Sequence, residues 1–284
     1  MKEVVEKVKT SIEKMPALSP VINKINEVAN DKGASAQDLT DVIQLDPVLT
    51  AKVIRMVNSA YFGLSQQIKS LKQAVVMLGI NTIKNVALSS SFLSIVNLKG
   101  QSSLDGEEFW QHSLGVAVAS KLIARRLGVD ETYIEEYFIA GLIHDIGKVL
   151  INNFFPDEMN EILAASSKKD EPIVEIEKRI MKLSHEEIGI AIGKKWKFEN
   201  ALLFAVGKHH HPVLQGSSAI FSMVVSVADT FVKILKVGFS GNYKIEPVPE
   251  EVWSAINQDE ESIFSALSTI NEEIEKAKLF LKQK

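Results

Sequence analysis

The stretch GLIHDIGK, Gly141–Lys148, decides how the rest of this sequence is interpreted. It places an imidazole, His144, directly before a carboxylate, Asp145, at the end of an apolar run. Such a pair can bind one divalent ion together, or the carboxylate can bridge two ions. The glycines at 141 and 147 let other backbone or substrate atoms come close. The alternative is that the pair only closes a helix, where a histidine interacts favourably with the helix dipole.

The histidines of the chain favour the metal interpretation, because all six lie around this stretch and neither end carries any. A phosphate-binding loop is excluded, since five residues, one too many, separate Gly141 from Gly147. In addition, Val149 stands where a serine or threonine would bind magnesium. The histidines are His112, His144, His185, His209, His210 and His211.

The composition indicates a globular chain. Its 284 residues are 46% hydrophobic, enough for one large or two small domains with a full core. No apolar run approaches 18 residues and no basic, apolar leader follows Met1, so neither a membrane span nor secretion is expected. The absence of cysteine excludes disulfides and thiolate metal sites and fits a reducing compartment. We therefore expect a cytoplasmic protein.

Charge is distributed unevenly along the chain. Residues 1–100 hold 12 basic and 8 acidic side chains, although the whole chain has a net charge of −4. No Asp or Glu occurs in the segment 47–104, which would attract an anionic partner, or would simply form a solvated face. The charge is modest for a DNA-binding domain, so a protein partner is expected rather than nucleic acid. The basic residues of this segment are Lys52, Arg55, Lys69, Lys72, Lys84 and Lys99.

The hydrophobic pattern predicts an all-α fold. Ser19-Pro20 and Asp46-Pro47 each offer an N-cap followed by proline at the first helical position, and Ser35 is a third candidate cap. The helix that starts at Pro47 is expected to continue until Gly63. Residues 36–57 also resemble a helix-turn-helix, but ordinary bundle packing gives the same pattern. No alternating strand pattern of useful length occurs.

Turn-forming residues divide the chain into three parts. The segment 98–106 favours a boundary near residue 104, so residues 1–104 are expected to form one helical lobe and 105–240 a second. Residues 241–284 form a C-terminal helical extension. This extension carries a heptad-like stripe that is expected to pack on its own domain, with a homodimer as the alternative. The stripe comprises Ile263, Leu267, Ile270, Ile274, Ala277 and Leu281.

Two predicted helices carry candidate ligands on one face. Glu108 precedes His112 by four residues, so both side chains share a face of the helix that ends at Leu127. This spacing can deliver a carboxylate and an imidazole to one ion, and a surface ion pair is the alternative. Asp229 lies in an apolar helix predicted over 220–235, where an ionised carboxylate is costly unless a positive group meets it. A metal ion would be such a group.

The remaining histidines lie at predicted helix ends. Ser184-His185-Glu186-Glu187 matches a capping box, which places His185 in the first turn of a helix. The run His209-His210-His211 ends the next helix, because Pro212 disfavours helical geometry in the residue before it. At most two of these three rings can readily converge on one ion.

These motifs resemble a known family. The order FWQHS, GLIHDIGK, SHEEIG, KHHHP and VAD is similar to the HD superfamily of metal-dependent phosphohydrolases. The upstream MPALSP, QLDPVLTAKVIRMVNSAYFG and IKSLKQAVVMLGI resemble the HDOD family of bacterial signalling proteins. The resemblance covers roughly residues 11–235 and implies that the second lobe is an HD-type helical bundle.

The resemblance also implies a set of ligands. In similar HD enzymes the matching residues bind one or two divalent ions, for which iron, manganese, zinc and magnesium fit a site without sulfur. The implied first ligands are His112, His144, Asp145 and Asp229. Relatives that hydrolyse cyclic dinucleotides add residues that match His185, His209, His210 and Glu108.

One departure from those hydrolases shapes the expected function. They follow their paired histidines with a glutamate and a Gly-Tyr-Pro signature, whereas His210 is followed here by His211-Pro212-Val213. HDOD proteins are regarded mainly as regulatory modules, so the resemblance implies a signal-transduction module with a retained metal site, little or no hydrolytic turnover and a protein partner. The alternative is an HD phosphohydrolase acting on a nucleotide or cyclic dinucleotide, in which Asp145 and Lys148 would be catalytic and a phosphate group would be bound. A nucleic-acid-binding regulator is the third reading.

Overall fold

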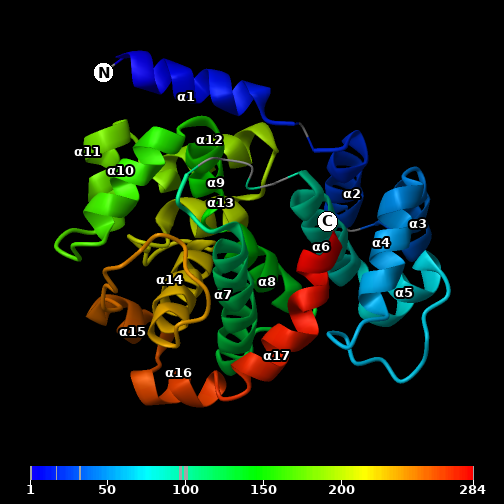
Figure 1. Cartoon of the computed structure of the whole chain (residues 1–284). Helices are drawn as coiled ribbons and strands as arrows, with labels where there is room; N and C mark the ends of the chain where they lie inside the picture. Colours follow the sequence, from blue (N-terminus) through cyan, green and yellow to red (C-terminus); the bar gives the residue numbers. More distant parts are fainter. Residues whose placement is uncertain (1, 17, 32, 96–97, 99–101, 284) are drawn as a thin grey trace.

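The chain folds into helices joined by short turns, and no strand occurs in the part that the structure describes, which confirms the all-α fold. The structure is a computed structural model and describes residues 2–16, 18–31, 33–95, 98 and 102–283. None of the described helices is long and apolar enough to cross a membrane. The elements, shown in Figure 1, are α1 (Lys2–Lys14), α2 (Pro20–Asn30), α3 (Ala36–Gln44), α4 (Pro47–Val57), α5 (Leu71–Leu78), α6 (Ile80–Ile95), α7 (Gly106–Arg126), α8 (Ile134–Ile143), α9 (Ile146–Phe154), α10 (Pro156–Ser166), α11 (Ile173–Met181), α12 (His185–Lys195), α13 (Asn200–Lys208), α14 (Ala219–Ile234), α15 (Glu250–Ile256), α16 (Glu260–Ala266), α17 (Ile270–Ala277) and the 3-10 helix η1 (Lys278–Gln283).

Helices α2 to α6 pack together as the first lobe, and their starts follow the predicted caps. The side chains of Ser19, Ser35 and Asp46 accept hydrogen bonds from the first-turn backbone of α2, α3 and α4. The predicted end of α4 at Gly63 is wrong, because the helix stops at Val57. The carboxamide of Asn58 donates to the carbonyls of Ile54 and Ile68 and accepts from the Ile68 amide, so this side chain replaces the helical hydrogen bonds.

The second lobe is organised around α7, which packs against α8 and α14, while α9, α12 and α13 complete the bundle. Two glycines of the GLIHDIGK stretch allow these helices to approach closely. A Cβ atom on Gly141 would lie 2.6 Å from the Val116 carbonyl oxygen of α7, and one on Gly147 would collide with the His185 carbonyl of α12. The glycines therefore bring backbone close, as the sequence predicts, and set His144 and Asp145 between α7 and α12.

Helix α1 lies on the second lobe, over α9 and α12 (Figure 1), whereas the sequence pattern assigns residues 1–104 to the first lobe. The ammonium of Lys195, at the end of α12, donates to the carbonyls of Ile12 (2.7 Å), Glu13 (2.9 Å) and Met15 (2.7 Å). A lysine from another helix thus satisfies the carbonyls that α1 leaves open at its C-terminal end. The Trp196 indole also donates to the Pro16 carbonyl at 3.1 Å.

The C-terminal extension runs back across both lobes. Helices α16 and α17 pack on α7, and η1 reaches α4 and α6 of the first lobe (Figure 1). The stripe from Ile263 to Ala277 is buried in these contacts, and Leu281 packs against the core. The stripe therefore packs on its own chain, and a homodimer formed through it would first have to expose these side chains.

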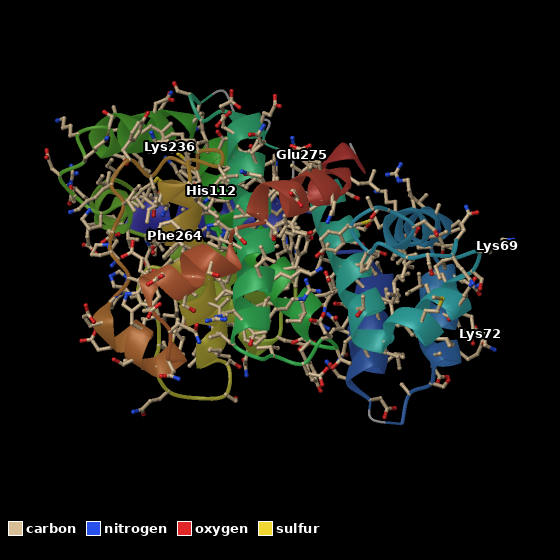
Figure 2. The ribbon with its side chains drawn as sticks, turned by 90° about the horizontal axis from the view of Figure 1, so that it is seen from below. Lys69, Lys72, His112, Lys236, Phe264 and Glu275 are labelled. Atoms are coloured by element: carbon tan, nitrogen blue, oxygen red, sulfur yellow. The ribbon has the colours of Figure 1, made fainter. Side chains whose placement is uncertain are left out.

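The basic segment does not form one continuous face. Lys84 is buried, with ion pairs to Glu136 (3.6 Å) and Glu199 (3.4 Å) of the second lobe, so its expected place on a basic surface is wrong. Lys99 lies outside the described residues. Arg55, Lys69 and Lys72 are exposed and Lys52 is partly exposed; Figure 2 shows Lys69 and Lys72 at the outer edge of the first lobe, away from His112.

Candidate metal centre

Seven of the eight candidate ligands come together in the interior of the second lobe. They form three groups, in each of which the ligand atoms lie within 4.8 Å of one another. The groups share His144 and His209, so they form one connected cluster. We refer to it as the metal centre, although metal binding itself stays a prediction. The groups are His112, His144 and Asp229; His144, Asp145 and His209; and His185, His209 and His210.

Asp145 stands between two sets of histidines. Its Oδ1 atom lies 3.2 Å from Nε2 of His185 and 3.6 Å from Nε2 of His209, while Oδ2 lies 3.3 Å from Nε2 of His144. On the other side, Oδ1 of Asp229 lies 3.1 Å from Nε2 of His112 and 3.9 Å from Nε2 of His144. A carboxylate in the position of Asp145 can bridge two ions, as its place in the sequence predicts.

Three rings are oriented by hydrogen bonds at Nδ1. His144 donates from Nδ1 to the Gly141 carbonyl at 2.7 Å, and Nδ1 of His209 lies 3.1 Å from the Ala205 carbonyl. His185 donates from Nδ1 to the carboxylate of Glu177 at 2.6 Å. Because these oxygens can only accept, the proton of each neutral ring sits on Nδ1 and the Nε2 lone pair faces the centre. That is the arrangement that metal-binding histidines adopt.

Several buried atoms of the centre have no hydrogen-bond partner among the described residues. They include Nε2 of His112 and His144, Oδ1 of Asp145 and Asp229, and Nε2 of His210. A buried polar atom without a partner costs about 1–3 kcal/mol, so several together are unfavourable unless an ion meets them. A divalent ion held by imidazole nitrogens and carboxylate oxygens fits this donor set.

The electrostatics keep the ligands in their metal-binding forms. Burial opposes ionisation of Asp145, but Lys148 and His144 hold its pKa well below the usual range. Burial likewise opposes ionisation of Asp229, but Lys233 and His112 hold its pKa well below the usual range. Burial lowers the pKa of His112 and, helped by neighbouring histidines, lowers that of His210 strongly. Both rings are therefore neutral, as a metal ligand must be.

His209 differs from these two rings. Burial lowers its pKa, but the interactions with the carboxylates of Asp145 and Glu186 outweigh this effect and raise the pKa above its usual value. The raised pKa favours a proton on this ring when no ion is bound. An ion at this position would replace that proton.

Lys148 links Asp145 of the centre to two polar residues outside it. Its ammonium donates to Oδ2 of Asp145 (2.8 Å), Oδ1 of Asn242 (2.9 Å) and the Ser240 hydroxyl (3.4 Å). Ser240 and Asn242 come from the turn-rich segment after α14, where nothing in the sequence pattern marked them.

The eighth candidate, Glu108, lies outside the centre, as does His211, the third histidine of the consecutive run. The side chain of Glu108 is exposed in the first turn of α7 and belongs to none of the three groups, so its role as a ligand stays a prediction. The backbone carbonyl of Glu108 accepts a hydrogen bond from the Phe239 amide at 3.0 Å. His211 is also exposed, so two of the three consecutive rings converge, in agreement with the sequence.

Sequence reasoning missed the carboxylates that support the histidines. Glu177 in α11 is fully buried and binds both Nδ1 and the backbone amide of His185. Glu186 accepts from the His210 amide at 3.0 Å. A signal for Glu177 exists, since it shares the helical stripe of Ile173, Val174 and Met181, where an acid is out of place.

Fold and site together define the class: an all-helical protein with a buried histidine–aspartate cluster suited to divalent ions. Comparison with known families agrees with this class. The model of the HDOD domain matches residues 15–212, and the chain belongs to the HDOD domain family. The family expected from the sequence motifs is thereby confirmed.

Three solved structures have a similar fold. An HDOD domain protein of unknown function from Geobacter sulfurreducens is 26% identical, with a TM-score of 0.77 over 98% of this chain and 99% of that one. A protein from Shewanella amazonensis, provisionally described as a phosphohydrolase, is 22% identical with a TM-score of 0.73 over 97% and 98%. One from Marinobacter aquaeolei, provisionally described as a signal transduction protein, is 16% identical with a TM-score of 0.73 over 99% and 65%. The chain spans half or less of the length of the curated relatives that it matches.

Proposed function

We propose that this protein is a regulatory signal-transduction module whose second lobe binds one or two divalent ions and hydrolyses substrates slowly or not at all. The observation that carries the proposal is the enclosure of the centre. The side chains of His144, Asp145 and Asp229 are 0%, 2% and 6% exposed. A substrate as large as a cyclic dinucleotide needs to be held at the reacting atoms, and an enclosed centre offers it no such place.

The residues that would hold the ions follow from the geometry. His112, His144, Asp145 and Asp229 would hold one ion, and His185, His209 and His210, with Asp145 shared, would hold a second. Iron, manganese, zinc and magnesium remain the candidates for a set of nitrogen and oxygen donors. A divalent ion in such a centre supplies a Lewis acid for phosphoryl oxygens and activates water. In a regulatory module the same ions would instead stabilise one arrangement of the helices.

The helices of the centre also contact the first lobe, which supports a signalling role. Glu135 of α8 accepts from the Tyr61 hydroxyl at 2.9 Å and pairs with Lys121 of α7 at 2.6 Å. Lys84 of α6 pairs with Glu136, the next residue of α8. We infer that a change in α7 or α8 on ion binding is transmitted through these buried polar contacts to the first lobe, whose exposed lysines would bind a protein partner.

A second candidate is a metal-dependent phosphohydrolase, favoured by the likeness to the Shewanella amazonensis structure. In that case Asp145 would help to hold the ions and Lys148 would hold Asp145 in place. The substrate would be a nucleotide or cyclic dinucleotide, and the centre would have to open to admit it.

Elemental analysis of protein purified without a histidine tag, combined with a hydrolysis assay, tests the proposal. We expect stoichiometric metal in the wild type, loss of metal in Asp145→Ala, and turnover of cyclic di-GMP, nucleotides and a generic phosphodiester no faster than in that variant. His211→Ala is the matched control, because it removes an exposed histidine outside the centre. Wild-type turnover clearly above the Asp145→Ala background would establish the phosphohydrolase, and protein without metal would exclude both readings.

A further inference from the structure

We propose that Lys233, and not Lys148, is the residue that binds a phosphate oxyanion at the rim of the metal centre. The inference rests on the proposed metal-binding function and adds a ligand class to it: inorganic phosphate or the phosphate group of an ester. Each of the two central carboxylates carries a lysine, Asp145 with Lys148 and Asp229 with Lys233. The surroundings of the two lysines differ, and this difference assigns their roles.

The hydrogen-bonding capacity of Lys148 is fully used within the protein. An ammonium group has three protons to donate, and Lys148 faces three acceptors, on Asp145, Ser240 and Asn242. Its side chain is 1% exposed. To bind an external anion it would have to abandon buried acceptors, each of which would then lack a partner. Lys148 therefore positions Asp145 and the segment 240–242 and is not available to a ligand.

Lys233 uses only part of its hydrogen-bonding capacity within the described part of the chain. It follows Asp229 by one turn of α14 and pairs with Oδ2 of that residue at 2.5 Å, its one ion pair within the described part of the chain. Its side chain is 11% exposed, so it lies at the boundary between the centre and solvent. Oδ1 of Asp229 stays directed at His112, which leaves that atom for an ion while Oδ2 keeps the lysine in place.

Lys233 lies beside the centre, since its partner Asp229 contacts His112 through Oδ1 at 3.1 Å, and His210 belongs to the second set of ligands. Beyond His210, the partly exposed carboxylate of Glu246 lies 3.8 Å from Nδ1 of that ring. Water and salt screen an exposed charge of this kind. The ammonium of Lys233 is thus a cation that an anion approaching Asp229 from the solvent side would meet.

The charge balance of the occupied centre favours an anion. Four carboxylates lie in or directly behind the centre, on Asp145, Asp229, Glu177 and Glu186, against the two lysines, which leaves two negative charges. One divalent ion would balance these charges, and a second would leave an excess of two positive charges. An oxyanion restores neutrality in a site of low dielectric, where uncompensated charge is expensive. Phosphate is therefore expected to bind more tightly to protein that holds two ions.

The test is calorimetric titration of inorganic phosphate into metal-replete protein, with metal content measured on the same samples. We expect Lys233→Met to weaken phosphate binding at least tenfold while its metal content equals that of the wild type. Lys233→Arg should restore affinity to within a few-fold, because a guanidinium binds phosphate as well. Lys236→Met is the matched control, since it removes an exposed lysine of the same segment, and it should leave affinity unchanged. Phenyl phosphate, titrated in parallel, separates the two ligands: tighter binding than inorganic phosphate assigns an ester.

Several outcomes would overturn the inference. Unchanged phosphate affinity in Lys233→Met would do so, as would a larger loss in Lys148→Met at equal metal content. Wild-type protein that holds metal but binds neither phosphate nor phenyl phosphate refutes the anion site and leaves the proposed function intact. Protein without metal refutes both. If circular dichroism shows that Lys233→Met is unfolded, Lys233→Gln replaces it with the same expected loss.

Discussion

Oδ1 of Asp145 lies 3.2 Å from Nε2 of His185, although the two residues begin different helices. Through this contact a single carboxylate touches both halves of the histidine cluster. Both halves are therefore expected to lose metal when Asp145 is changed. Only one half should lose metal when the changed residue supports a histidine of that half alone.

The first prediction concerns Asp145 itself. We expect Asp145→Asn to lower bound metal to about a tenth of the wild-type content or less, because the amide is a poorer ligand for either ion. Asparagine keeps the shape and a hydrogen-bond acceptor for Lys148, which limits the cost of leaving that buried ammonium unpaired. Elemental analysis, with the melting temperature measured alongside, provides the answer. Full metal content in the folded variant would contradict a bridging role.

The second prediction separates the two halves. Glu177 accepts from Nδ1 of His185, and removal of such a support typically weakens metal binding about 10–100-fold. Glu177→Gln should therefore lose one ion while the ion near His112 and Asp229 remains. Glu175→Gln, on the exposed side of the same helix, is the control and should keep both. Titration of metal-free protein with zinc or manganese distinguishes one site from two. Loss of both ions in Glu177→Gln would show that the halves do not bind independently.

The third prediction concerns pH in metal-free protein. Burial, reinforced by His209 and His185, holds the pKa of His210 well below its usual 6.5. Between the two pKa values the unfolded chain binds a proton at this residue and the folded chain does not, so stability falls as pH drops below 6.5. The limit for one group is about 1.4 kcal/mol per pH unit. We expect His210→Gln to show a shallower decline between pH 6.5 and 5, measured by denaturant unfolding in a chelator. Parallel curves for the two proteins would argue against a neutral His210.

Asp145 and Asp229 extend this dependence to lower pH. Their pKa values lie well below the usual 3.8, so their contribution is complete above that pH and is lost as pH falls further.

The fourth prediction concerns the first lobe. Because Lys84 is buried in ion pairs and the remaining lysines are few, we expect no sub-micromolar binding to duplex DNA. Fluorescence anisotropy of a labelled duplex, recorded between low and physiological salt, measures this affinity. The double variant Lys52→Ala/Arg55→Ala serves as the comparison. Tight, salt-sensitive binding that this double variant weakens would favour the nucleic-acid-binding regulator instead.

Local signals explain what could be predicted from the sequence. Ser19, Ser35, Asp46 and Ser184 cap helices because each interaction spans two or three residues, so the pattern contains both partners. The histidines and aspartates of the centre could be named because few residue types bind metal. Glu108 shows the limit of this reasoning, since its spacing places it on the same helix face as His112 but its side chain is exposed.

Other features depend on contacts between distant segments. Asn242 supports Lys148 across 94 residues and Lys195 caps α1 across more than 180, and neither pairing has a periodic signature. The end of α4 at Val57, earlier than predicted, also depends on such a contact, because the carboxamide of Asn58 binds the backbone ten residues further along the chain. Such interactions follow from the packing of the helices, which one sequence alone does not specify.

Helix α12 connects the metal centre to α1, because His185 begins the helix and Lys195 ends it. At 1.5 Å per residue, the eleven residues form a rigid lever roughly 15 Å long. A tilt of roughly 4° about the His185 end would move the far end by about 1 Å, enough to stretch a hydrogen bond of 2.7 Å beyond its useful range. The three carbonyls of residues 12, 13 and 15 would then lose their shared donor. A small displacement of one imidazole would in this way weaken the attachment of α1 to α12.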